Sequence, residues 1–163
     1  MAAAEFERLH GIALARLLCG PAGREVKVEM RPDEGWTSVV PARGPAVVIR
    51  HRPRPRRSGK IAGGRMWGFT FTQDQIDCLR RLAKNGRLRL VLVCGSGSRD
   101  PVGPEIALLE VKDVARVLDL ASFLEQRLTV QAQPRKELWV LRGSVRVKIP
   151  RARFRAPNSS KAN

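Results

Sequence analysis

The stretch MWGFTF, residues 66–71, is followed by TQDQIDCLRRLAKNGRLRLVLVC, residues 72–94, and together they predict a strand, a helix and a second strand in direct succession. In the first part Trp67, Phe69 and Phe71 alternate with Gly and Thr, which is typical of a strand with one buried face. We expect the three aromatic rings to lie in the core, because the opposite face offers only small side chains.

The second part of the stretch predicts a capped helix and an interior strand. Thr72 with Gln75 three residues later forms a capping-box pattern, and Gly86 ends the apolar helical repeat. Residues 88–94 are rich in Leu and Val, which favours a strand inside a sheet.

The remaining elements complete an α+β pattern. Apolar side chains recur at helical spacing over residues 5–18 and 111–118, so we expect about three helices in all. Further strands are predicted over residues 26–30, 36–40, 46–50, 106–109, 128–131, 138–141 and 145–149. Because strands outnumber helices and most connections read as hairpins, we predict a mainly antiparallel or mixed sheet with helices on one face. Trp36 and Trp139 are expected to be structural.

Composition bounds the domain organisation and the class of partner. A chain of 163 residues with 43% hydrophobic content fits one domain over residues 1–155, followed by a polar flexible tail over residues 156–163. The 31 Lys and Arg exceed the 15 Asp and Glu, and the net charge of +16 favours a polyanionic partner. No apolar run approaches the roughly 20 residues that span a bilayer, so we expect no membrane partner. The acidic start of the chain does not resemble a secretory signal, which predicts a cytoplasmic protein.

The basic run RHRPRPRRSGKIAGGR, residues 50–65, contains no acidic residue. It has little that could be buried, and we expect it to be a hairpin arm that projects from a sheet, in the connection between two strands. Its cationic members, which we predict to bind nucleic acid, are Arg50, Arg52, Arg54, Arg56, Arg57, Lys60 and Arg65.

A second basic cluster begins at Arg142 near the C-terminus. In the predicted strand over residues 145–149 the apolar side chains alternate with Arg146 and Lys148, which places these two cations on one face about 7 Å apart. That spacing suits successive phosphates. The predicted contacts of this cluster are Arg146, Lys148, Arg151, Arg153 and Arg155.

A short pattern suggests a metal-dependent alternative. Asp100 followed by Glu110 and Lys112 resembles the active-site pattern of PD-(D/E)xK nucleases. That resemblance implies that the two carboxylates, with Glu5 or Glu7 as possible further ligands, hold Mg²⁺ and that the Lys supports the attacking water. Glu110 fits equally well as an acid in the first turn of the following helix.

The other chemical motifs point away from catalysis. The spacing of the three Cys and two His residues favours neither a disulfide framework nor a zinc site, and we expect small buried thiols. Apart from the Mg²⁺ of the nuclease alternative we expect no metal or cofactor. No nucleophile is paired with a base.

The leading interpretation is therefore a non-catalytic protein that binds the phosphate backbone of nucleic acid with low sequence specificity. The two basic clusters would suit DNA and RNA, and single and double strands, equally well. One alternative is the Mg²⁺-dependent nuclease. A second is a subunit of a larger protein or nucleoprotein assembly, in which the basic run becomes ordered on binding.

Overall fold

The computed structural model describes Gly11 and residues 26–41, 44–57, 63–84, 86–96, 104–133 and 136–150. Several predictions from the sequence concern other parts of the chain. The helix over residues 5–18, apart from Gly11, the tip of the basic run at 58–62, and the tail over 156–163 lie outside the described residues.

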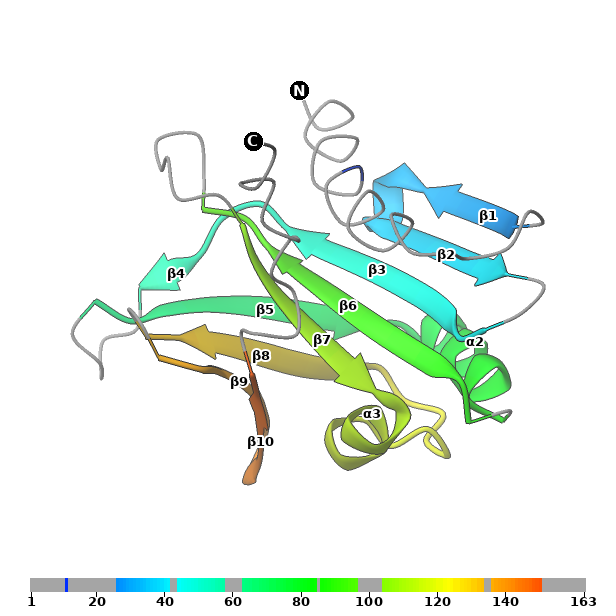
Figure 1. Ribbon diagram of the computed structural model, residues 1–163. Coiled ribbons are helices and arrows are strands. Elements are labelled where there is room, and N and C mark those ends of the chain that lie inside the picture. The colour runs from blue at the N-terminus through cyan, green and yellow to red at the C-terminus, as the bar shows by residue number, and fades with distance from the viewer. Residues whose placement is uncertain are drawn as a thin grey trace, which may run out of the picture.

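The described residues form two five-stranded sheets, which stack on one another in Figure 1. Sheet 1 has the order β1-β2-β3-β6-β7, and its strands are antiparallel except for the parallel pair β3 and β6. Its strands are β1 (Val26–Arg31), β2 (Trp36–Pro41), β3 (Ala46–Arg52), β6 (Leu88–Cys94) and β7 (Glu105–Glu110). A short 3₁₀ turn, η1 (Pro32–Glu34), connects β1 to β2.

Sheet 2 is antiparallel throughout and has the order β10-β9-β8-β5-β4. Its strands are β4 (Arg56–Arg57), β5 (Arg65–Phe71), β8 (Gln126–Ala132), β9 (Leu138–Arg142) and β10 (Val145–Ile149). The predicted α+β class is confirmed, with two sheets in place of the one that we expected.

The basic run connects the two sheets. β3 pairs with β2 and β6, whereas β5 pairs with β8 and β4, so the strands on either side of the run are not partners in a hairpin. β3 and β5 lie in different sheets because the aromatic face of β5 packs across the core against sheet 1. The predicted hairpin arm stays a prediction, since the tip of the run lies outside the described residues. Within the run the antiparallel pair is β4 with β5.

The main core lies between the two sheets. Trp67, Phe69 and Phe71 are at most 1% exposed, which confirms the predicted core face of β5. They belong to one cluster with Leu90 and Leu92 of sheet 1. Burial of such side chains contributes roughly 1.5–3 kcal/mol each. The opposite face of sheet 1 carries a second buried cluster that includes Ile49 and Val91, so β3 and β6 are apolar on both faces.

Two α-helices are described, and both lie at the end of the sandwich opposite β4 (Figure 1). α2 (Gln73–Ala83) begins with the predicted capping box, in which the Thr72 hydroxyl accepts from the Gln75 amide and the Gln75 side chain accepts from the Thr72 amide. α3 (Val111–Val117) follows β7 directly. Apolar side chains of both helices, such as Leu79 and Val114, extend the main core.

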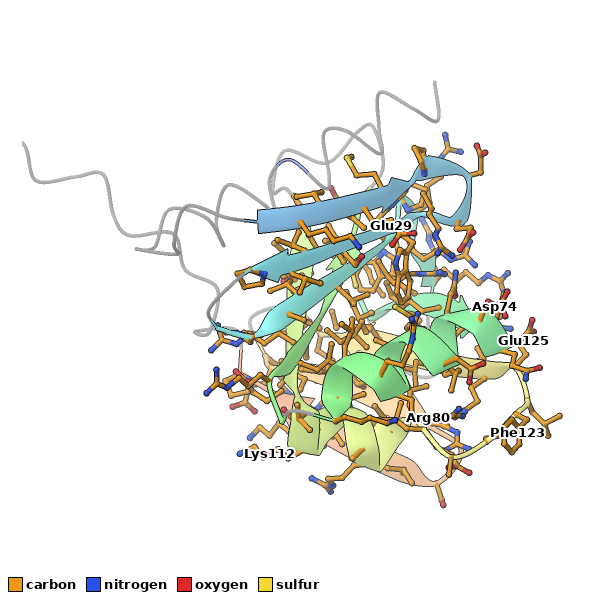
Figure 2. The ribbon with its side chains drawn as sticks, turned by 90° about the vertical axis from the view of Figure 1, so that its right-hand side faces the viewer. Glu29, Asp74, Arg80, Lys112, Phe123 and Glu125 are labelled. Carbon is orange, nitrogen blue, oxygen red and sulfur yellow. The ribbon has the colours of Figure 1, made fainter. Side chains whose placement is uncertain are left out.

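Arg80 attaches α2 to the loop that precedes β8. Its guanidinium donates to the carbonyl oxygens of Leu120 and Ser122 and pairs with Asp77. It also lies 5.4 Å from the ring centroid of Phe123, and Figure 2 shows Arg80 and Phe123 near each other at this side of the molecule.

Candidate nucleic-acid interface

The first half of the basic run leaves sheet 1 and joins sheet 2. Arg52 ends β3, and Arg56–Arg57 form β4 against β5. Nε of Arg52 donates to the carbonyl oxygen of Gly68 in β5 over 2.7 Å. The amide of Gly95, just after β6, donates to the carbonyl oxygen of Arg52 over 2.7 Å. The start of the run is therefore held by both sheets.

Because Gly68 has no side chain, a second guanidinium can lie close to the residue that Arg52 contacts. Arg127 of β8 lies against it, and a Cβ at Gly68 would come within 2.7 Å of Nη2 of Arg127. A larger residue would displace this guanidinium. Arg52 and Arg127 thus meet at one glycine, although they come from strands of different sheets.

These residues line a concavity of about 320 Å³, which we call the arginine pocket. Its described lining consists of Arg52, Pro53, Arg54, Pro55, Arg56, Gly68 and Arg127, four of which carry guanidinium groups and none a carboxylate. Within the described ranges, Arg54, Arg56 and Arg127 form no ion pair. The charges in this pocket repel one another, and an anion would relieve that repulsion. The planar fork of Arg suits phosphate oxygens in particular.

The pocket opens at one side of the outer face of sheet 2, which is the face turned away from the core. Side chains alternate along a strand, so Met66 and Thr70 point outward where Trp67, Phe69 and Phe71 point into the core. The outer face, which follows from this alternation and the strand register, comprises Arg56, Met66, Gly68, Thr70, Arg127, Thr129, Gln131, Trp139, Leu141, Arg146 and Lys148.

The register sets the order of these side chains across the sheet. One row runs from β4 to β10 through Arg56, Met66, Gln131, Trp139 and Lys148. The next row runs from β5 to β10 through Gly68, Thr129, Leu141 and Arg146. In these two rows the basic side chains stand on the edge strands β4 and β10 and uncharged side chains lie between them, whereas Arg127 stands on the central strand β8.

Arg146 and Lys148 are exposed on one face of β10 while Val147 and Ile149 are buried, as the alternation predicted. Their surroundings differ. Lys148 forms an ion pair with Glu137. The guanidinium carbon of Arg146 lies 4.9 Å from the ring centroid of Trp139.

Arg50 does not lie on this surface. It is only 6% exposed, and its Nη atoms donate to Oε1 of Gln75 and to the carbonyl oxygen of Thr70, each over 2.8 Å. It lies 5.2 Å from the ring centroid of Phe71. Burial, reinforced by the charge of Arg52, lowers the pKa of Arg50 to about 10. Arg50 therefore holds β3, β5 and α2 together, and we leave it out of the candidate interface.

Arg65 is also engaged internally. It pairs with Glu105 of β7 over 3.1 Å and lies 5.3 Å from the ring centroid of Trp67. Arg57 is exposed opposite it on β4. The remaining predicted contacts, Lys60, Arg151, Arg153 and Arg155, lie outside the described residues.

The residues of the nuclease pattern have separate positions. Glu110 is the N-cap of α3, where its amide donates to Asp113, and it pairs with Arg89 over 3.4 Å. Glu110 therefore stands at the start of the helix, next to the first-turn position that the sequence offered as the alternative to a metal ligand. Lys112 is exposed on α3, at the outside of the molecule in Figure 2. Asp100 lies outside the described residues, and the metal site stays a prediction. Among the residues with described positions, no three His, Cys, Asp or Glu side chains gather closely enough to hold a metal ion.

Sequence reasoning missed Gly68, Arg127 and Trp139 as surface features. The signal was available for the last of these, because Leu138 and Val140 are apolar neighbours that alternate with it. Both are fully buried, and Trp139 is half-buried on the opposite face. The meeting of Arg127 with Gly68 depends on a pairing between distant strands, which no local pattern reveals.

No family model matches the chain, and neither curated proteins nor solved structures yield a match. None of the helices in the described ranges has the length and apolar character needed to cross a membrane.

Proposed function

We propose that this protein binds nucleic acid through its phosphates, with low sequence specificity, on the outer face of sheet 2. The observation that carries the proposal is the meeting of Arg52 and Arg127 at Gly68, with Arg54 and Arg56 lining the same pocket. Four guanidinium groups without a carboxylate among them make a site for a polyanion.

Two further features support nucleic acid as that polyanion. The net charge of +16 attracts a charged polymer over long distances. The five strands of sheet 2 span four strand spacings, or roughly 19 Å, which is long enough to follow several phosphates from the arginine pocket to Arg146. Low specificity follows because guanidinium groups that contact phosphates do not read the bases.

The test is binding of labelled oligonucleotides of several unrelated sequences over a salt series. We expect similar affinities for all sequences and a steep loss of affinity between about 50 and 200 mM salt. A triple variant, Arg54→Gln, Arg56→Gln and Arg127→Gln, should weaken binding at least about tenfold and reduce the slope of log affinity against log salt by about 2 to 3.

A matched control removes the same charge elsewhere. Lys84, Lys112 and Arg116 are exposed and, in the described part of the chain, form no ion pair. Changing all three to Gln also lowers the net charge from +16 to +13 (16 − 3), but should weaken binding less than about threefold. Equal losses in the two triple variants would refute a specific site and leave only general attraction.

A further inference from the structure

We infer that the nucleic acid bound on this face is single-stranded, with unpaired bases stacked at Trp139 and Arg146. This inference rests on the proposed function and adds the class of substrate. Trp139 differs from the other two Trp side chains, because Trp36 and Trp67 are 2% and 1% exposed in the core whereas Trp139 lies half-buried on the outer face.

The geometry of the pair suits a base. The guanidinium carbon of Arg146 lies 4.9 Å from the centroid of the Trp139 ring. A guanidinium stacked on a ring keeps its N–H groups directed sideways, where they can bind a phosphate, and offers its second face to a base. A base can therefore stack on the second face of the Arg146 guanidinium, as a third planar group after the Trp139 ring and the guanidinium itself.

The layout around the pair also favours single strands. In the strand register Trp139 stands between Gln131 of β8 and Lys148 of β10. The centre of the outer face, between Arg127 and Trp139, consists of uncharged side chains, namely Thr129 and Gln131 of β8 and Leu141 of β9. The arginine pocket lies at one side of this centre and Arg146 at the other. A strand whose phosphates bind the basic edges would place its bases over the uncharged centre. The roughly 19 Å width of the sheet corresponds to about two or three nucleotides.

A duplex would use this face less well. Its bases are stacked on one another and their planes are not accessible, so only the phosphates could contact the sheet. Reading bases within a groove requires a helix or ribbon that enters it. A sheet face that carries a partly exposed aromatic ring instead resembles in chemistry the platforms that stack unpaired bases.

The experiment compares three probes on the full chain by fluorescence anisotropy. They are a single strand of about 12 nucleotides, the same strand with every base removed, and the corresponding duplex. The single strand should bind about tenfold or more tightly than the strand without bases, and also more tightly than the duplex. Tryptophan fluorescence should be quenched by the single strand and unchanged by the strand without bases.

Variants of Trp139 test the stacking directly. Trp139→Leu should lower the affinity for the single strand by about tenfold while the affinity for the strand without bases stays the same, and Trp139→Phe should restore part of the loss. Thermal unfolding checks that both variants fold. The comparison of probes on the unchanged protein does not depend on either variant.

The outcomes separate this inference from the proposed function. If all three probes bind equally, or the duplex binds best, while the arginine-pocket variant weakens them all, stacking is refuted and phosphate binding stands. If no probe binds in a salt-dependent manner, both proposals fail. Loss of affinity in Trp139→Leu for the strand without bases would indicate a distorted sheet and would refute a role in stacking.

Discussion

Gly95 lies against the backbone of Pro53, so close that a Cβ on Gly95 would be 2.9 Å from the Cα of Pro53. The amide of Gly95 donates to the carbonyl oxygen of Arg52, and its own carbonyl oxygen accepts from Nε1 of Trp67 over 2.8 Å. One residue thus joins the end of β6, the start of the arginine pocket and the core. The pocket is positioned by this contact because it begins at Arg52 and Pro53.

The first prediction concerns that contact. Gly95→Ala should lower the free energy of unfolding by about 1–3 kcal/mol, because the backbone at Pro53 cannot move aside as the end of a side chain can. It should also weaken nucleic-acid binding by displacing the pocket. Urea unfolding and anisotropy measure the two effects. A variant as stable as the unchanged protein would contradict the contact.

The second prediction uses Gly68 as a counterpart. The three atoms nearest to a Cβ there would all belong to the guanidinium of Arg127, the movable end of a long side chain. Gly68→Ala should therefore leave the free energy of unfolding within about 1 kcal/mol of the original, since Ala restricts the unfolded chain more than Gly does. Binding should nevertheless weaken several-fold. Unchanged binding would show that the position of Arg127 does not matter.

The third prediction separates Arg50 from the arginines of the pocket. Arg50→Met replaces a buried cation, whose Nε has no hydrogen-bond partner, with an apolar side chain. We expect a change in the free energy of unfolding of less than about 1.5 kcal/mol, whereas Arg50→Ala should cost about 2–4 kcal/mol through the cavity that it leaves.

Neither Arg50 variant should alter oligonucleotide affinity as much as Arg54→Met does, although Arg50→Met and Arg54→Met remove the same charge. If Arg50→Met weakened binding as strongly as Arg54→Met, Arg50 would belong to the interface after all. Anisotropy at one salt concentration is sufficient for this comparison.

The fourth prediction follows from the thiols. Burial raises the pKa of Cys94 well above its ordinary value and also raises that of Cys78, which is half-buried in α2. Because the thiolate is the reactive form, a raised pKa means slower reaction at pH 8. In a Cys19→Ser chain neither thiol should react rapidly with Ellman's reagent until the protein is unfolded.

The pH dependence distinguishes the two thiols. As the pH rises to 9 and beyond, Cys78 should become reactive before Cys94, which is fully buried. One equivalent of thiol that reacted within the mixing time at pH 8 would contradict the burial of this pair. The predicted buried thiol is thus confirmed at Cys94, is half-buried at Cys78, and lies outside the described residues at Cys19.

The sequence was sufficient where the information is local. The alternation of Trp67, Phe69 and Phe71 and the pairing of Thr72 with Gln75 each depend on neighbours within a few residues, and the structure confirms both. The choice of sheet partners is not local. β3 pairs with β6, whose sequence is about 40 residues further along the chain, while β5 joins the other sheet.

The candidate site shows the same division. The exposure of Arg54 and Arg56 could be predicted from a basic run with almost no apolar residues. The burial of Arg50 could not, because its partners, Thr70 and Gln75, are 20 and 25 residues away in sequence. The position of Arg127 beside Gly68 likewise depends on the pairing of β8 with β5, which no local pattern in the sequence predicts.

The outermost strands of sheet 2, β4 and β10, both carry exposed cations, which hinder a second copy from adding its own strand there. A bound polyanion would cancel that repulsion. Molecules sitting next to each other on one polymer would then have unshielded backbone edges at close range, and their tendency to associate laterally should increase with occupancy. Under the proposed function, solubility and nucleic-acid loading should therefore be coupled through the exposed cations of these two strands.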